Sequence, residues 1–105
     1  MTIPTDCSQA PIGDVLEDVE LKEPRRCRVI LHNDDYTTMD FVVEILRVVF
    51  HKSQSEAVRI MLAVHENGRG DCGLYPVEVA ETKVAVVHER ARAAGFPLRC
   101  SLEYV

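Results

Sequence analysis

The stretch ILHNDDYTTM, residues 30–39, decides how this chain folds, because it runs an apolar strand pattern into three polar residues and then into a helix start. Apolar and polar side chains alternate over residues 25–31, and this period of two predicts a strand with one buried face. Asn33, Asp34 and Asp35 follow, and short polar side chains at a strand end bond nearby backbone donors in turns. The stretch therefore predicts a strand, a turn and a helix in close succession.

The helix after this turn is predicted from about Thr38 to Phe50. Thr37 and Asp40 form a T-x-x-D pattern, in which the threonine hydroxyl caps free backbone donors and the aspartate lies near the positive helix end. Three charged residues, spaced by four and three, form one narrow polar stripe: Asp40, Glu44 and Arg47. The other faces are apolar, so this helix is buried on most sides or lines a groove.

Caps and turn residues mark the remaining elements. A capping box at Ser53 and Glu56 begins a second helix, which ends near His65. We further predict a strand over residues 69–75, a helix over 76–94 and a strand over 98–104. The order strand, helix, helix, strand, helix, strand predicts an α/β (α+β) fold, a small three-stranded antiparallel sheet with three helices packed on one face.

Charge divides the chain into two parts. Residues 1–24 contain six acidic residues against one lysine and no aromatic residue, which predicts a disordered acidic extension. Residues 25–105 form the predicted folded domain and contain 11 acidic and 11 basic residues. This balance gives no electrostatic footprint for nucleic acid or an anionic membrane. Without a long apolar run or the pattern of a signal peptide, we expect a cytoplasmic protein.

The residues do not favour an enzyme or a bound cofactor. The four cysteines are far apart and form no CxxC pair, so neither a zinc site nor a redox motif is predicted. Asp34 and Asp35 are adjacent and would point in opposite directions on extended backbone, which does not suit a general acid and base pair. We predict no catalytic residue, no metal and no cofactor. The alternative of an enzyme would be a small one that uses Cys72 or the aspartate pair.

Two groups of residues have both a structural and a functional interpretation. Asn33, Asp34 and Asp35 are either turn residues or acceptors for a cation at the rim of a groove. His65 is favoured near a helix end by the helix dipole, but it also shares one helical face with Met61 and Val64. On this helical face two apolar side chains lie beside a polar one. The pattern fits both a helix that packs in the core and a helix that lines a binding pocket.

Three segments carry a resemblance to a known family: RVILHNDDYTTMDFVVEIL, RIMLAVHENGRGDCGLYPVEVAETKVA and PLRCSLE. Together they resemble the ClpS family, bacterial adaptor proteins that recognise N-degrons and hand them to the ClpA unfoldase and ClpP peptidase. The resemblance covers about residues 25–103. It implies a compact α/β core with a mobile amino-terminal extension. Its implied ligand is a protein that begins with Leu, Phe, Tyr or Trp and has a free α-amine.

The resemblance also assigns roles to residues of this chain. The family's amine-binding positions fall on Asn33, Asp35 and His65, with Asp34 beside them at the pocket edge. An α-ammonium group has three N–H donors and calls for convergent acceptors, at least one of them anionic. The family's apolar pocket falls on Thr37, Met39, Val42, Met61, Val64 and Leu98.

Further implications concern specificity and partners. In the family, Met39 stands at the pocket mouth and rejects β-branched first residues. Glu78 and Lys83 belong to the surface that meets the amino-terminal domain of a ClpA-type AAA+ unfoldase, although on composition alone they are solvated helix charges. We expect a monomer that binds neither nucleic acid nor membrane.

Two residues depart from the family pattern. Thr38 stands where the family commonly has proline, and His32 replaces the usual aliphatic residue. These departures leave a rival function open, a specialised or degenerate paralogue that regulates the unfoldase without carrying degrons.

Overall fold

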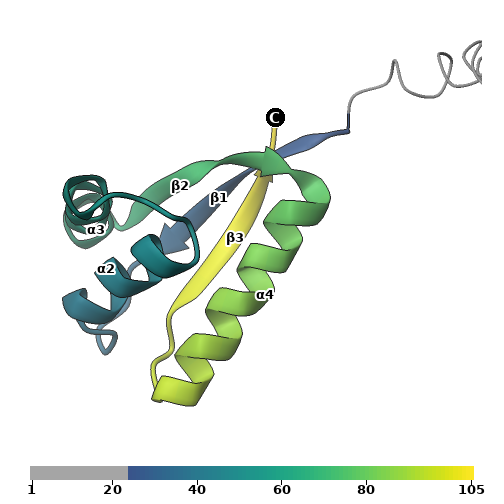
Figure 1. The fold of residues 1–105 in the computed structure, drawn as a ribbon. Helices are drawn as coiled ribbons and strands as arrows, with labels where there is room; N and C mark the ends of the chain where they lie inside the picture. The colour runs from purple at the N-terminus through teal and green to yellow at the C-terminus, as the bar shows by residue number, and fades with distance from the viewer. Residues whose placement is uncertain (1–23) are drawn as a thin grey trace, which may run out of the picture.

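The computed structural model describes residues 24–105, which form one three-stranded sheet and three helices (Figure 1). In chain order the elements are β1 (Arg26–His32), α2 (Met39–Val48), α3 (Gln54–Asn67), β2 (Arg69–Pro76), α4 (Val77–Ala94) and β3 (Arg99–Tyr104). The predicted fold class and element order are confirmed, and each boundary lies within about two residues of the predicted one. The predicted disordered extension lies outside the described residues, apart from Pro24.

β1 is the central strand of the sheet and pairs antiparallel with both β2 and β3. Its alternating residues Cys27, Val29 and Leu31 are fully buried. In β2, Cys72 is an extra residue opposite the step from Val29 to Ile30. This bulge changes which residues face the core, and it places Tyr75 opposite Cys27.

All three helices contribute to one core. α4 packs along β3 and α3 packs on β2, while α2 packs on α3 (Figure 1). Each helix supplies buried apolar residues to the same cluster as the buried side of β1: Val42, Ile45 and Leu46 from α2, Ala57, Ile60 and Val64 from α3, and Ala80, Val87 and Ala91 from α4. The predicted packing of helices on one face of the sheet is therefore observed.

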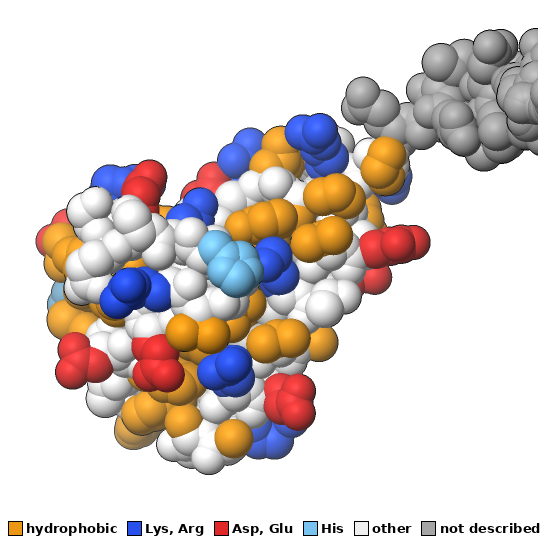
Figure 2. All heavy atoms as spheres, in the orientation of Figure 1, with side chains coloured by type: hydrophobic (Ala, Val, Ile, Leu, Met, Phe, Trp, Pro, Cys, Tyr) orange, Lys and Arg blue, Asp and Glu red, His pale blue; other side chains and the backbone are white. Residues whose placement is uncertain are grey.

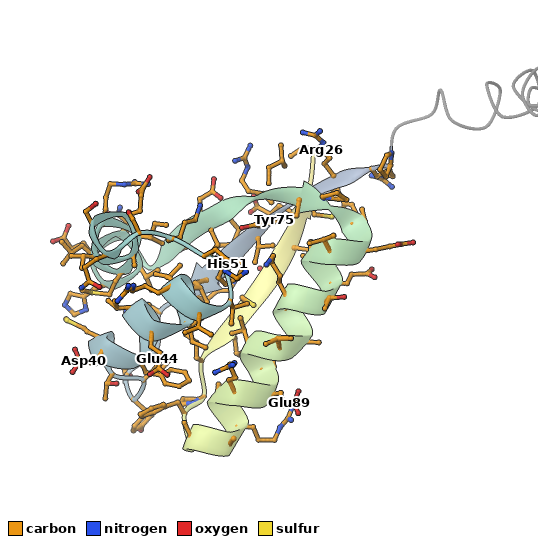
Figure 3. All side chains as sticks on the ribbon, in the orientation of Figure 1. Arg26, Asp40, Glu44, His51, Tyr75 and Glu89 are labelled. Atoms are coloured by element: carbon orange, nitrogen blue, oxygen red, sulfur yellow. The ribbon has the colours of Figure 1, made fainter. Side chains whose placement is uncertain are left out.

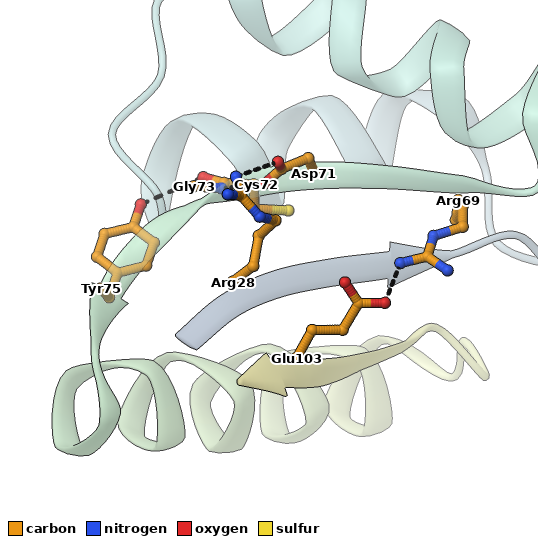
Figure 4. Close-up of polar contacts among 7 residues, drawn as sticks. All are labelled: Arg28, Arg69, Asp71, Cys72, Gly73, Tyr75 and Glu103. Carbon is orange, nitrogen blue, oxygen red and sulfur yellow. Dashed lines mark hydrogen bonds and ion pairs between the residues drawn. The ribbon is translucent and has the colours of Figure 1, made fainter. Parts of the chain in front are cut away.

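The opposite face of the sheet carries ion pairs between strands. Arg28 of β1 pairs with Asp71 of β2 at 2.8 Å, and Arg69 of β2 reaches Glu103 of β3 across the sheet (Figure 4). These groups are well exposed, so each pair adds little to stability. Ile30 lies on this face and is nevertheless only 3% exposed.

One predicted cap is wrong. Thr38, not Thr37, caps α2, because its hydroxyl oxygen accepts the N–H of Phe41 at 3.2 Å. The hydroxyl of Thr37 instead donates to the carboxylate of Asp34 at 2.7 Å. The cap predicted at Ser53 is confirmed, since its hydroxyl oxygen accepts a backbone N–H at the start of α3.

The surface carries both signs of charge. Acidic and basic side chains are interspersed on the face seen in Figure 2. No helix within residues 24–105 is long and apolar enough to cross a membrane.

Candidate functional site

A pocket of about 260 Å³ opens where the loop between β1 and α2 meets α2 and α3. Nine residues line it: Asn33, Asp34, Asp35, Thr37, Met39, Val42, Met61, Val64 and His65. All nine belong to the ten that the family resemblance assigned to the amine site and the apolar pocket. The tenth, Leu98, does not line it; this residue is 3% exposed in the core and borders a separate hollow beside the end of α4.

A hydrogen bond between distant parts of the chain brings the two sides of the rim together. The backbone N–H of Asn33 donates to the carbonyl oxygen of Gly68 at 3.0 Å. Gly68 ends α3 with a φ of 88°, a left-handed conformation that glycine adopts without strain. The start of the loop is thus tied to the end of the helix whose last turn carries His65.

Asp34 holds the loop from inside. Its Oδ1 accepts the backbone N–H groups of Tyr36 at 2.8 Å and Thr37 at 2.7 Å, and its Oδ2 accepts the Thr37 hydroxyl. Burial works to raise the pKa of the Asp34 carboxyl, but the hydrogen bonds from Thr37 and Tyr36 outweigh it and lower this pKa below its ordinary value. Because this pKa is lowered, the ionised Asp34 carboxylate and its loop contacts stabilise the folded protein at pH values above the ordinary carboxyl pKa. This stabilisation is lost as the pH falls through the lowered pKa of the folded protein.

Three other acceptors lie at the rim of the pocket. Asn33, Asp35 and His65 are exposed, and within residues 24–105 no side-chain hydrogen bond or ion pair engages them. An amide oxygen, a carboxylate and an imidazole nitrogen form an acceptor set that suits a cation with several N–H donors. Asp35 supplies the negative charge.

An apolar wall lies behind these acceptors. Val42 and Val64 are buried, and Met61 is half-buried one helical turn from Val64 and His65. Met39, the first residue of α2, is 44% exposed at the mouth of the pocket. The pocket therefore combines an apolar interior with a charged and polar rim.

Gly70 is a positioning residue that the sequence analysis missed. A Cβ built there would lie 2.6 Å from Cγ2 of Val64 and 3.1 Å from the carbonyl oxygen of Ile60. Only a residue without a side chain lets α3 pack this closely on β2, and α3 carries three residues of the pocket. A glycine inside a strand pattern was the available signal.

The two departures from the family pattern do not line this pocket. Thr38 caps α2 and so fixes the start of the helix at Met39. His32 belongs to the opposite face of the sheet, where its Nε2 lies 2.6 Å from the Ser101 hydroxyl.

Two buried thiols, Cys72 and Cys100, do not form a second reactive site among residues 24–105. Burial raises the pKa of both Cys72 and Cys100 to about 12, so these thiols are poor nucleophiles. Within residues 24–105 no group of three His, Cys, Asp or Glu residues is arranged to hold a metal ion. A larger hollow of about 660 Å³ lies along α2 beside Asp40, Glu44 and His51 (Figure 3). Its lining carries both acidic residues, Asp40 and Glu44, and basic residues, Arg47 and Lys52.

Glu78 and Lys83 lie on α4, away from the pocket. Glu78 is exposed in the first turn of the helix. Lys83 is not a simple solvated charge, because it is half-buried and its Nζ donates to the carbonyl oxygen of Val49 at 2.7 Å. The same Nζ lies 5.7 Å and 5.2 Å from the ring centroids of Phe50 and Tyr75. Lys83 therefore stabilises the end of α2.

Comparison with known proteins identifies relatives along most of the chain. Residues 22–101 match the family described as "ClpS: ATP-dependent Clp protease adaptor protein ClpS". An ATP-dependent Clp protease adapter protein ClpS from Oleidesulfovibrio alaskensis is 68% identical over 93 residues, covering 89% of each chain. The protein of the same name from Nitratidesulfovibrio vulgaris is 64% identical over 92 residues, which cover 88% of this chain and 92% of the relative.

A solved structure is also similar. Agrobacterium tumefaciens ClpS2 bound to L-phenylalaninamide matches with a TM-score of 0.76 and 34% sequence identity. The match covers 79% of this chain and all of that one.

Proposed function

The chain belongs to the ClpS family of adaptor proteins of the ATP-dependent Clp protease, and we propose that its pocket binds protein substrates by a bulky apolar first residue with a free α-amine. In this proposal the first side chain, that of Leu, Phe, Tyr or Trp, enters the apolar pocket. The α-ammonium group lies at the rim, against Asn33, Asp35 and His65. The bound substrate is then delivered to a ClpA-type unfoldase.

One observation carries this proposal: three acceptors that no side chain of residues 24–105 engages meet an apolar wall at one pocket. A first residue presents the matching pair of groups, because its positive charge and its side chain branch from the same carbon atom. The similar ClpS2 protein was solved with L-phenylalaninamide, a small molecule with a free α-amine and an aromatic side chain.

The free energies involved indicate that binding needs both the apolar pocket and the acceptors at its rim. An aromatic side chain buries about 150 to 250 Å², which is worth roughly 4 to 6 kcal/mol at about 25 cal/mol per Å². A micromolar complex requires about 8 kcal/mol, before the costs of ordering the peptide. Charge-assisted hydrogen bonds to the amine would supply the difference.

Fluorescence anisotropy with labelled peptides tests the proposal. Peptides that begin with Leu or Phe should bind the parent protein, and the same peptide beginning with Ser should not. Asp35→Ala and His65→Ala should each abolish binding and leave the circular dichroism spectrum unchanged, because both side chains are exposed and neither is bonded to another side chain of residues 24–105. Glu66→Ala is the matched control, since it removes an exposed charge next to His65 that does not line the pocket. Equal binding of the Leu and Ser peptides would refute the proposal.

Delivery to the unfoldase uses a separate surface in this proposal. Glu78, exposed at the start of α4, would contact the amino-terminal domain of the unfoldase. Glu78→Lys should keep peptide affinity and weaken association with the unfoldase. Lys83 is a less informative position, because its substitution also disturbs the end of α2.

We further propose that residues 1–24 act in delivery rather than in binding, and that the adaptor works as a cytoplasmic monomer. Removal of residues 1–20 should leave peptide affinity intact and stop degradation of a bound substrate in a reconstituted Clp protease assay. Normal degradation by the truncated protein would contradict this role.

A further inference from the structure

Asp34 and Asp35 are adjacent carboxylates at one pocket, yet their surroundings differ. Both oxygens of Asp34 are occupied, by two backbone N–H groups and one hydroxyl of the same loop. Within residues 24–105, no hydrogen bond or ion pair engages the carboxylate of Asp35, which is exposed. The carboxylate of Asp34 is therefore used inside the loop, whereas that of Asp35 is accessible to a ligand.

The bonds of Asp34 fix the middle of the loop between β1 and α2. The first residue of the loop is held by the bond from the Asn33 N–H to Gly68, and the end is held by the cap at Thr38. Between these points, Tyr36 points outward, with its side chain 77% exposed, so packing does not hold it. The carboxylate of Asp34 is what holds the backbone of Tyr36 and Thr37.

We propose that Asp34 is a positioning residue that fixes Thr37 beside Met39 at the pocket mouth and thereby sets the selectivity against β-branched first residues, while Asp35 alone supplies the charge for the amine. This inference rests on the proposed function. A rigid mouth can reject an extra carbon near the peptide backbone, whereas a loose mouth can move aside. Loss of Asp34 therefore changes which side chains enter, and loss of Asp35 changes how well any amine is held.

Substitution by asparagine separates the two roles. In Asp34→Asn, the side-chain oxygen can still accept both backbone N–H groups, and the amide nitrogen can donate to the Thr37 hydroxyl oxygen. The charge is lost but the loop stays fixed. In Asp35→Asn the acceptor shape is kept and the charge that faces the amine is removed. Asp34→Ala removes all three loop bonds.

The experiment measures the affinities of two peptides, beginning with Leu and with Ile, for the parent protein and these three variants. Asp34→Ala should weaken Leu-peptide binding by about tenfold or more and reduce the ratio of Leu to Ile affinity. Asp34→Asn should stay within about threefold of the parent in both affinity and ratio. Asp35→Asn should weaken both peptides by the same factor and leave the ratio unchanged. If Asp34→Asn loses as much affinity as Asp34→Ala, Asp34 acts through its charge and the inference is wrong.

A second readout needs no peptide. Hydrogen exchange measured by NMR should show the amide protons of Tyr36 and Thr37 protected in the parent and in Asp34→Asn, and unprotected in Asp34→Ala. Unprotected amides in the parent would overturn the positioning role. A parent protein with protected amides that binds no Leu peptide would instead overturn the proposed function, and with it the role in selectivity.

Discussion

A single methyl group added at Gly70 tests whether close packing of α3 on β2 sets the geometry of the pocket. The added Cβ would lie 2.6 Å from Cγ2 of Val64, about 1 Å short of an ordinary carbon contact of about 3.6 Å. A change of rotamer at Val64 would relieve only part of the clash, because the Cβ also lies 3.1 Å from the backbone oxygen of Ile60, which moves only with the helix. Gly70→Ala must therefore displace the helix.

Displacement of α3 has two expected consequences. Overpacking of this kind costs about 1 to 3 kcal/mol, which for a domain of this size lowers Tm by roughly 5 to 20 °C. The helix also carries Met61, Val64 and His65, so the apolar wall and one acceptor move relative to the loop that carries Asn33 and Asp35. Leu-peptide affinity should fall about tenfold at a temperature where the variant is fully folded.

Thermal unfolding followed by circular dichroism and peptide anisotropy measures both effects. The matched control is Gly95→Ala, because Gly95 has a φ of 81° but no atom within 4 Å of a built Cβ, and it does not line the pocket. This control should lose about 1 kcal/mol of stability through backbone strain and keep full affinity. A Gly70→Ala protein with the Tm and affinity of the parent would refute the packing argument, and one that is destabilised but binds normally would refute the link to the pocket.

Three further predictions address specificity, stability and thiol chemistry. Met39→Ala should admit peptides that begin with Ile or Val, since Met39 stands at the pocket mouth, and Ile-peptide affinities as weak as those of the parent would contradict this. Lys83→Met keeps the apolar stem and removes the donor to the carbonyl oxygen of Val49, so we expect a loss of about 1 to 2 kcal/mol in urea unfolding, whereas an unchanged midpoint would show that the bond contributes nothing. Cys72 and Cys100, whose pKa values are raised by burial to about 12, should resist iodoacetamide at pH 8 in the folded protein and react fully in urea; rapid labelling of the folded chain would show that they are accessible.

The element boundaries were predictable because each carries a local signal. Ser53 caps one helix, Pro76 precedes another, and Gly95 follows it in the left-handed conformation. The choice between Thr37 and Thr38 as the cap of α2 could not be made from the residue types alone, because both offer the same hydroxyl. The carboxylate of Asp34 decides it by binding the hydroxyl of Thr37.

The site depends on contacts between residues far apart in the chain, so periodicity alone could not assemble it. Asn33 and His65 come from different elements and meet through the bond between the Asn33 N–H and Gly68. Family resemblance supplied the residues that the structure gathers around the pocket, but it did not show that Asp34 is occupied inside the loop. The contacts of Lys83 with Phe50 and the end of α2 likewise required the packed structure.

The most direct test of the proposed amine site compares two peptides that differ only at the first nitrogen atom. One begins with Phe and a free α-amine, and the other begins with acetylated Phe. Acetylation keeps the aromatic side chain but removes the charge and two of the three donors that Asn33, Asp35 and His65 would accept. We expect the free peptide to bind in the micromolar range or tighter and acetylation to weaken binding by about 100-fold or more. Equal affinities for the two peptides would contradict the proposed amine site.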